Sequence, residues 1–315
     1  MTLTAPLPTE VEGAAPPTGA TAEVRRGGWS VSIIVLVIVL LWLIPTVGVL
    51  VTSFRPESVV NDTGWWTTFA HLFDSGQWTL ANYREALDQG GFENAFLNSL
   101  AVTIPSTVIP ITIAAFAAYA FSWMEFRGRF VMFVAVVGLL VVPLQMALIP
   151  ILRLYSGGAR IGDVPIFPDL ALNGTFLGIW LAHTAFGLPL AVYLLRNFIG
   201  SLPSSIIESA RVDGADHFTI FWRLVVPLSV PALAAFAIFQ FLWVWNDLLV
   251  ARIFLGGTDE TQVLTLALND LNGTRGEDWH LLTAAAFISM ILPLAVFFAL
   301  QRYFIRGLTA GAVKG

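Results

Sequence analysis

Apolar residues fall into six long runs that are separated by polar segments. The runs lie near residues 31–52, 98–123, 130–154, 172–195, 227–250 and 281–304. Each is long enough to cross a hydrocarbon layer of about 30 Å, which takes about 20 helical residues. A helix pairs its backbone polar groups internally, and lipid offers them no other partner. The pattern therefore predicts an all-α membrane protein with six transmembrane helices.

The composition agrees with a chain that lies mostly in lipid. Hydrophobic residues make up 57% of it and charged residues 12%, which is about half of the charged share usual in soluble domains. The net charge of −5 is spread over a few loops, so nothing indicates binding to nucleic acid. The chain has no cysteine, which excludes disulfides, thiolate nucleophiles and thiolate metal sites.

The first 28 residues differ from the rest of the chain. They are rich in Ala, Pro, Thr and Glu, offer little to bury, and contain the basic pair Arg25 and Arg26 near their end. This composition predicts a disordered tail over residues 1–28 and a transmembrane domain over residues 29–315. The apolar run after the tail is too long for a signal peptide and lacks a convincing cleavage site, so we interpret it as the first span.

The basic residues indicate how the chain is oriented. With six spans, one side of the membrane receives Arg25, Arg26, Arg127, Arg129, Arg196, Arg211, Arg223, Arg302, Arg306 and Lys314, and the other receives Arg55, Arg84, Arg153, Arg160, Arg252 and Arg275. The side richer in Lys and Arg faces the cytoplasm. We therefore expect a multi-pass protein of the cytoplasmic membrane, with both termini and the loop at residues 200–227 inside.

The loop at residues 200–227 is polar but has the signals of folded structure. Ser205 followed three residues later by Glu208 is a capping-box pattern, which predicts a short helix. Gly214 is placed to end it, because glycine adopts a left-handed conformation at low cost. Asp216 is placed to cap a second short helix, which Pro227 would close. The pattern predicts a bent helix-Gly-helix element between two spans.

This element has the features of a docking site for another protein. Ala210 and Gly214 are small enough to allow a close approach, and Glu208, Arg211 and Asp213 place charges around them. The alternative is an ordinary loop between two spans that happens to be helical.

Five residues of the loop resemble the signature of ABC-importer permeases. Glu208, Ala210, Gly214, Leu224 and Pro227 match its pattern of E-A-A, three residues, G, nine residues and I-x-L-P, with Ser209 for the second alanine and Val226 for leucine. In that family the element docks in a cleft of the ATPase subunit. The resemblance thus implies a type I ABC-importer permease fold, with ATPase-coupling residues Glu208, Ala210, Arg211, Asp213, Gly214, Ala215 and Pro227.

Polar side chains within the apolar runs are the candidates for a substrate path, because burying them in lipid is expensive. They are Gln145, His183, Gln240, Asn246 and Asp247. At helical spacing Gln240, Trp243 and Asp247 share one face, where aromatic rings beside hydrogen-bonding groups suit a sugar. Alternatively, Asp247 pairs with an arginine such as Arg252 and only holds helices together. We interpret His183 as a packing residue, since no metal-ligand partner is spaced near it.

Three further segments resemble carbohydrate-importer permeases. Residues 241–249 are similar to the pattern W-N-(D/E)-x-L, residues 82–87 to N-Y-x-x-x-L, and residues 301–315 to the family's C-terminal sequence Q-R-x-x-x-x-G-L-T-x-G-x-V-K-G. In relatives that C-terminal tail enters the ATPase dimer interface. The loop at residues 251–280, with the turn residues Gly256, Gly257 and Thr258, corresponds to a loop that reaches into the solute-binding protein.

The segment between the first two spans, residues 53–97, is unusually aromatic. It contains Trp65, Trp66, Phe69, Phe73, Trp78 and Tyr83. Such a segment packs either on the membrane surface, as an interfacial aromatic belt, or on another subunit. The sequence leaves both alternatives open.

The sequence contains no phosphate-binding loop and no serine elbow, so we expect no catalytic residues and no bound cofactor in this chain. ATP and Mg would lie on the partner ATPase. The resemblance implies a bacterial or archaeal sugar importer of the maltose type, most similar to alpha-glucoside permeases. Its partners would be a second homologous permease, two ATPase subunits, an extracytoplasmic sugar-binding protein and membrane lipid. The alternative function is an ion-coupled secondary sugar transporter.

Overall fold

The computed structural model describes residues 28–88, 91–258, 260–271 and 278–312, with side chains up to residue 302. The predicted disordered tail, apart from residue 28, lies outside the described residues. So do the last three residues of the predicted C-terminal motif, and the side chains of most of that motif.

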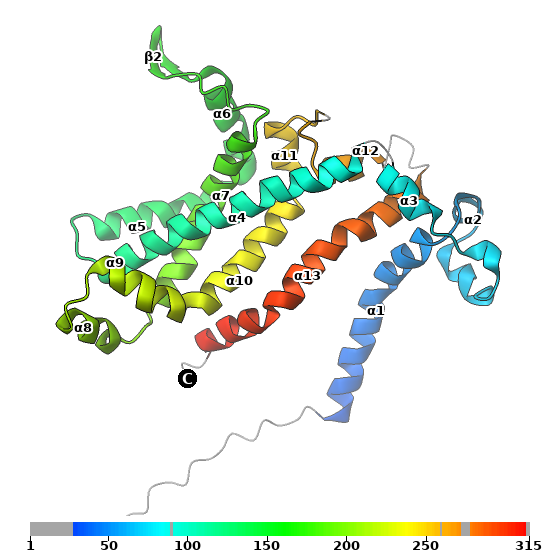
Figure 1. Ribbon diagram of the computed structural model, residues 1–315, viewed down its shortest axis with the longest axis horizontal. Coiled ribbons are helices and arrows are strands. Elements are labelled where there is room, and N and C mark those ends of the chain that lie inside the picture. Colours follow the sequence, from blue (N-terminus) through cyan, green and yellow to red (C-terminus); the bar gives the residue numbers. More distant parts are fainter. Residues whose placement is uncertain (1–27, 89–90, 259, 272–277, 313–315) are drawn as a thin grey trace, which may run out of the picture. The chain divides into compact units, whose positions relative to one another are not determined.

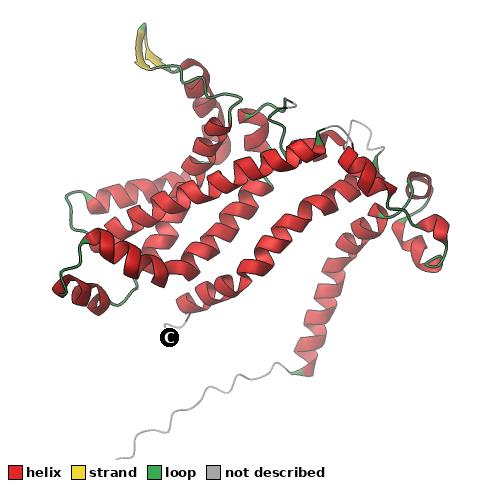
Figure 2. Cartoon of the chain, viewed as in Figure 1, coloured by secondary structure: helices red, strands yellow, loops and turns green. Residues whose placement is uncertain are grey.

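Within the described part of the chain, five helices are long and apolar enough to cross a membrane. They are α1 (Trp29–Ser53), α4 (Phe92–Trp123), α7 (Phe176–Ile199), α9 to α10 (His217–Trp245) and α13 (Trp279–Ala312). The prediction of an all-α membrane protein is confirmed, and Figure 2 shows helices nearly throughout. Each of these helices overlaps a predicted span, although α4, α7 and α13 extend beyond the apolar runs.

The third predicted span is not one straight helix. It consists of α5 (Arg129–Gly138), a 3-10 turn η3 (Leu139–Val141) and α6 (Leu144–Gly157), and the two helical parts are bent by 105° at the break. Val142 is extended and Pro143 directly precedes α6. A proline disfavours helical geometry in the residue before it, which explains why the break occurs here.

The second helix of the predicted helix-Gly-helix element continues through Pro227, so the prediction that Pro227 closes it is wrong. Helix α9 (His217–Ile220) passes through a π-helical turn η4 (Phe221–Val225) into α10 (Val226–Trp245). A proline ring clashes with the carbonyl four residues earlier, which for Pro227 is that of Arg223. Arg223 lies in the wider π turn, so the strain is taken up there and the helix is not broken.

Helices α4, α7, α10 and α13 form the packed part of the structure (Figure 1). Helix α10 contacts all three of the others, and α4 packs along α7. Ala114 and Ala118 of α4 and Ala191 of α7 are fully buried in the shared core. Small residues let helix backbones approach closely, which is how membrane helices pack without a hydrophobic driving force.

Shorter elements join these helices. They are α2 (Glu57–Asp62), η1 (Trp65–Ala70), η2 (Ser75–Gln77), α3 (Ala81–Asp88), β1 (Ala159–Ile161), β2 (Val164–Phe167), α8 (Ser204–Val212), α11 (Leu249–Phe254) and α12 (Leu264–Leu271). The hairpin of β1 and β2 was not predicted from the sequence. Its signal is Gly162-Asp163, a two-residue turn in which Gly162 has φ +60°.

Candidate functional site

The helix-Gly-helix element is present, but its first helix begins differently from the prediction. Helix α8 starts at Ser204, with Pro203 in the capping position and no side-chain cap. The predicted capping box of Ser205 and Glu208 is therefore wrong. Because the cap is Pro203 and the helix begins two residues earlier than predicted, Ser205 already lies inside its first turn and cannot cap it. The fixed φ of Pro203, −58°, prepares the chain for the helix.

The bend after α8 is a Schellman motif centred on Gly214. This residue has φ +82°, its N–H donates to the carbonyl of Arg211 at 3.0 Å, and the N–H of Ala215 donates to the carbonyl of Ala210 at 2.9 Å. These two bonds satisfy carbonyls that the helix end leaves without partners. The prediction that Gly214 ends the first helix is confirmed.

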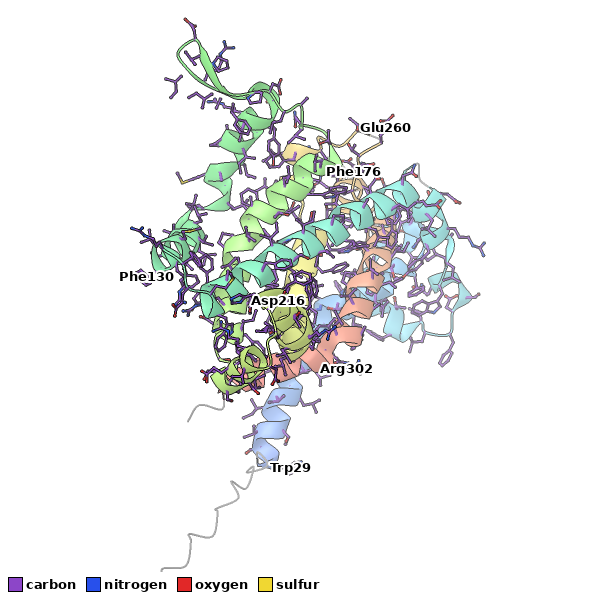
Figure 3. The ribbon with its side chains drawn as sticks, turned by 60° about the vertical axis from the view of Figure 1, so that its left-hand side comes forward. Trp29, Phe130, Phe176, Asp216, Glu260 and Arg302 are labelled. Carbon is purple, nitrogen blue, oxygen red and sulfur yellow. The ribbon has the colours of Figure 1, made fainter. Side chains whose placement is uncertain are left out.

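Asp216 caps the next helix, as predicted. Its carboxylate accepts a hydrogen bond from the N–H of Thr219 at 2.8 Å (Figure 3 labels Asp216). Hydrogen bonds from Thr219 lower the pKa of this carboxyl, because they stabilise its charged form. The direction in which the chain leaves the bend is therefore fixed on both sides of Gly214.

Buried apolar residues and two polar contacts hold this element on the helix bundle. Ile207 of α8 and Ile220 of α9 are each 1% exposed and belong to the core that α4 and α7 share. The Arg211 guanidinium donates to the carbonyl of Trp123 at 2.9 Å, and the Tyr119 hydroxyl lies 2.9 Å from Nδ1 of His217. A displacement of α8 or α9 would thus act on α4 directly. Sequence reasoning placed Arg211 at a docking surface and missed its role in this attachment.

A surface hollow of about 460 Å³ lies beside α8. Its lining residues are Ser205, Ile206, Ser209, Ala210, Asp213 and Leu224. They are small or of moderate size, and the hollow is shallow and open, so a side chain of another protein can enter it. Two predicted coupling residues, Ala210 and Asp213, line it, while Glu208 is exposed on the same helix.

The predicted substrate-path residues do not form one cluster. Gln145 and Asn246 are exposed, and the Asn246 side chain donates to the carbonyl of Leu242 at 2.7 Å. Helix α10 ends at Trp245, so Asp247 does not continue the helical face of Gln240 and Trp243, and that prediction is wrong. The reason is that the chain turns at Asn246 and starts a new helix, α11.

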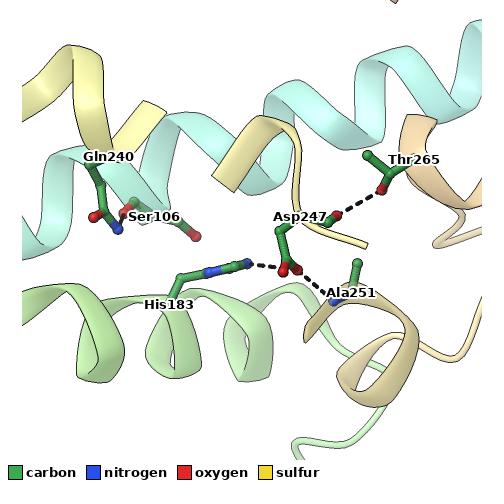
Figure 4. Close-up of polar contacts among 6 residues, drawn as sticks. All are labelled: Ser106, His183, Gln240, Asp247, Ala251 and Thr265. Carbon is green, nitrogen blue, oxygen red and sulfur yellow. Dashed lines mark hydrogen bonds and ion pairs between the residues drawn. The ribbon is translucent and has the colours of Figure 1, made fainter. Parts of the chain in front are cut away.

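Gln240 is fully buried where α4, α7 and α10 meet (Figure 4). Its Nε2 donates to the carbonyl of Ser106 at 3.1 Å. The side chain lies so close to Gly187 that a Cβ there would come within 2.7 Å of both terminal atoms of Gln240. Gln240 therefore joins α10 to α4 by a hydrogen bond and packs against α7.

Asp247 joins several elements near the end of α10 (Figure 4). Its Oδ2 lies 3.8 Å from Nε2 of His183 on α7 and accepts a hydrogen bond from the N–H of Ala251 at 3.0 Å. Its carbonyl accepts a hydrogen bond from the Thr265 hydroxyl at 2.8 Å. The expected pairing with Arg252 is not what the structure shows, because Asp247 turns inward to α7. His183 faces this carboxylate at a distance longer than a hydrogen bond, and its interpretation as a packing residue stays a prediction.

Trp243 lines an apolar cavity of about 270 Å³ at the bend between α5 and α6. Leu139 and Leu144 line it from the bent helices, and Phe186 and Pro189 line it from α7. Such a lining offers a sugar ring few hydrogen-bonding groups. Trp243 also packs edge-on against His183, with ring centroids 5.7 Å apart.

The turn Gly256-Gly257-Thr258 lies between α11 and α12, as an exposed loop with φ +78° and +79° at the two glycines. Asn98 of α4 donates to the carbonyls of Glu260 and Gln262, both at 3.0 Å, and so fixes the loop after this turn. No sequence pattern indicated this role of Asn98. Among the described residues, no group of three or more His, Asp or Glu residues is placed to hold a metal ion.

Residues 97–310 match the model of a protein family described as the inner membrane component of binding-protein-dependent transport systems. The chain belongs to this family. The match runs from α4 to α13 and includes the whole element around Gly214. The chain is therefore a multi-pass protein of the cytoplasmic membrane.

Relatives agree with this assignment. The chain is 56% identical to an osmoprotective compounds uptake permease protein of Synechocystis, GgtD, over 90% of this chain and 91% of that one. It is 45% identical to the alpha-glucoside transport system permease protein AglG of Rhizobium meliloti, over 91% of this chain and 97% of that one. A bacterial ABC transporter that imports alginate has the same fold, with a TM-score of 0.69 at 21% identity, covering 87% and 95% of the two chains.

The prediction of an ABC-importer permease of the sugar-transport type is confirmed by these matches. They support a binding-protein-dependent importer over an ion-coupled secondary transporter. Nothing in them tests the roles of individual residues, so the coupling and substrate-path residues stay predictions.

Proposed function

We propose that this permease passes a small carbohydrate from an extracytoplasmic binding protein into the cytoplasm by alternating access. The element at residues 200–227 is the observation that carries this proposal. Its bend is fixed by Gly214, its open hollow can receive a partner side chain, and it is attached to α4 through Arg211. A coupling element needs these three features: a rigid bend, a surface that a partner can bind, and an attachment through which its movement reaches the transmembrane helices.

The partner at this element would be an ATPase subunit, with ATP and Mg bound there and no catalysis by this chain. Two ATPase subunits and a second homologous permease would complete the transporter. Closure of the ATPase pair would move the two docked elements, and the attached spans would open toward the outside. We propose that residues 200–227 and both termini lie in the cytoplasm, because the arginine distribution predicts this orientation.

The substrate is proposed to be an alpha-glucoside or a similar disaccharide. Support comes from the relative named as an alpha-glucoside permease and from the similarity of residues 241–249 to sugar-importer permeases. A second candidate is an osmoprotective compound, because the 56% identical relative carries that name. The apolar surroundings of Trp243 favour main substrate contacts on the second permease.

The coupling role is tested in proteoliposomes that contain the assembled transporter and its binding protein. Glu208→Ala should reduce ATP hydrolysis stimulated by the binding protein and should reduce uptake in proportion. Glu125→Ala removes an exposed carboxylate outside the element and serves as the matched control. Normal stimulation and uptake in the Glu208→Ala transporter would remove this residue from the coupling mechanism.

The substrate is tested by calorimetry on the binding protein. Maltose, sucrose and trehalose represent the disaccharides, and glycine betaine represents an osmoprotectant without a sugar ring. Binding of a disaccharide alone supports the first candidate. Binding of glycine betaine alone would replace it with the second.

A further inference from the structure

The segment at residues 64–80, here called the aromatic segment, exposes large apolar side chains. Trp66 is 64% exposed, Phe69 54% and Phe73 102%. Leu72, Trp78 and Leu80 are also exposed. The segment contains a single charged residue, Asp74, together with His71. An apolar surface of this kind is unfavourable in water and indicates a contact with another apolar phase.

The segment has local structure that does not depend on its exposed rings. Trp78 Nε1 donates to the carbonyl of Leu72 at 2.9 Å, and the Thr67 hydroxyl donates to the carbonyl of Gly64 at 2.7 Å. The N–H of Gly76 donates to the Asp74 carboxylate at 2.9 Å. The backbone is therefore held by its own hydrogen bonds, and the exposed rings of Phe69 and Phe73 are available to a partner.

Both ends of the segment are attached to the last turns of α1. At one end, the Trp65 indole is so close to Gly48 that a Cβ on Gly48 would come within 2.8 Å of it. At the other end, the N–H of Thr79 donates to the carbonyl of Phe54 at 2.7 Å, and Asn82 donates to the carbonyl of Ser53 at 2.9 Å. The segment consequently lies beside the end of this transmembrane helix.

Arg55 strengthens this attachment. Its guanidinium donates to the carbonyls of Thr63 at 3.1 Å and Val59 at 3.2 Å, and the residue is only 1% exposed. Burial lowers the pKa of Arg55 from its usual value, which is so high that the group stays charged at neutral pH. These bonds hold α2 and Thr63, the residue directly before the aromatic segment, against the end of α1.

We propose that the aromatic segment is an interfacial anchor, with Trp66, Phe69 and Phe73 inserted among the lipid headgroups and upper methylenes of the leaflet where α1 ends. The occupant is lipid because both ends of the segment are attached at the end of a transmembrane helix, which is where a bilayer surface lies. Aromatic rings are enriched at this depth because their apolar faces leave water while the layer stays partly hydrated. The proposal is independent of the transported substrate.

The composition also predicts how the anchor responds to lipid charge. Amphipathic segments that recognise anionic lipid do so through Lys and Arg. The aromatic segment has neither, so its insertion should be the same in zwitterionic and in anionic bilayers and should not change with salt.

The absence of cysteine makes a direct test simple. The variants Phe73→Cys and Phe69→Cys of the full chain are spin-labelled separately in nanodiscs, and collision rates with oxygen and with a water-soluble nickel chelate are measured. Asp62→Cys, on an exposed residue of α2 next to the segment, is the matched control. Phe73 is fully exposed, so replacing it should not disturb folding.

The labels at positions 69 and 73 should collide frequently with oxygen and should lose most of the nickel collision rate seen at position 62, in both lipid compositions. Equal nickel collision at positions 62 and 73 would place the segment in water and overturn the proposal. Protection from both reagents that occurs only in the assembled transporter would show a protein partner and would overturn it as well.

Discussion

Replacing Gly214 with alanine is the perturbation whose effect is best defined by the structure. Gly214 has φ +82°, and a Cβ at this position would have no neighbour within 4 Å. The substitution therefore adds no clash and acts only through backbone conformation. A left-handed conformation costs an L-residue about 1–2 kcal/mol. This corresponds to a roughly 5- to 30-fold shift toward an opened bend.

Hydrogen exchange measures this shift without reference to transport. The amides of Gly214 and Ala215 donate the two bonds of the Schellman motif, so a peptide that contains them should exchange faster in Gly214→Ala, by up to the same factor. Coupling of ATP hydrolysis to uptake should weaken in parallel. Gly138→Ala is the matched control, because that glycine has ordinary helical φ and open space around its Cβ position. Unchanged exchange around position 214 would refute the reasoning.

Three further predictions concern other contacts. Gly187→Ala should bring a methyl group against the buried Gln240 side chain and lower the free energy of unfolding by about 1–3 kcal/mol. Adding Gln240→Ala to this variant removes the clashing side chain and should recover part of the loss, as measured by thermal unfolding. Asp216→Ala should speed hydrogen exchange in α9 at neutral pH. The pKa of Asp216 is lower in the folded protein than in the unfolded chain. The carboxylate therefore stabilises the fold fully above about pH 3.9, and this stabilisation is lost as the pH falls through the folded-state pKa. Asp216→Asn should remove this pH dependence. Asp247→Asn and His183→Gln should be non-additive in thermal unfolding, by about 0.5–3 kcal/mol in a double-mutant cycle; strict additivity would show that the two side chains do not interact.

Several elements that depend on local chemistry were predictable from the sequence, although the capping box of α8 and the hairpin of β1 and β2 were not. Hydropathy located five continuous spans because a membrane helix needs a long apolar run, and glycine and aspartate chemistry located the bend at Gly214 and the cap at Asp216. Prolines were harder to interpret. Pro143 coincides with a 105° bend, whereas Pro227 is absorbed by a π-helical turn, and hydropathy does not distinguish the two cases.

Contacts between distant segments were not predictable. His183 and Asp247 are far apart in the sequence and meet only because α10 ends at Trp245 and turns Asp247 toward α7. The attachment of Arg211 to the carbonyl of Trp123 depends in the same way on how α8 packs against α4. A single sequence contains no signal for such pairs, because each side chain also has a reasonable partner nearby, as Arg252 was for Asp247.

The most direct test of the coupling role is photo-cross-linking from the hollow of α8 in the assembled transporter. A photoreactive amino acid at position 209, in the lining of the hollow, should form an adduct with the ATPase subunit. The same group at position 162, in the turn between β1 and β2, should form none. An adduct of position 209 with the extracytoplasmic binding protein, or ATPase adducts from position 162 alone, would contradict both the orientation and the coupling role of residues 200–227.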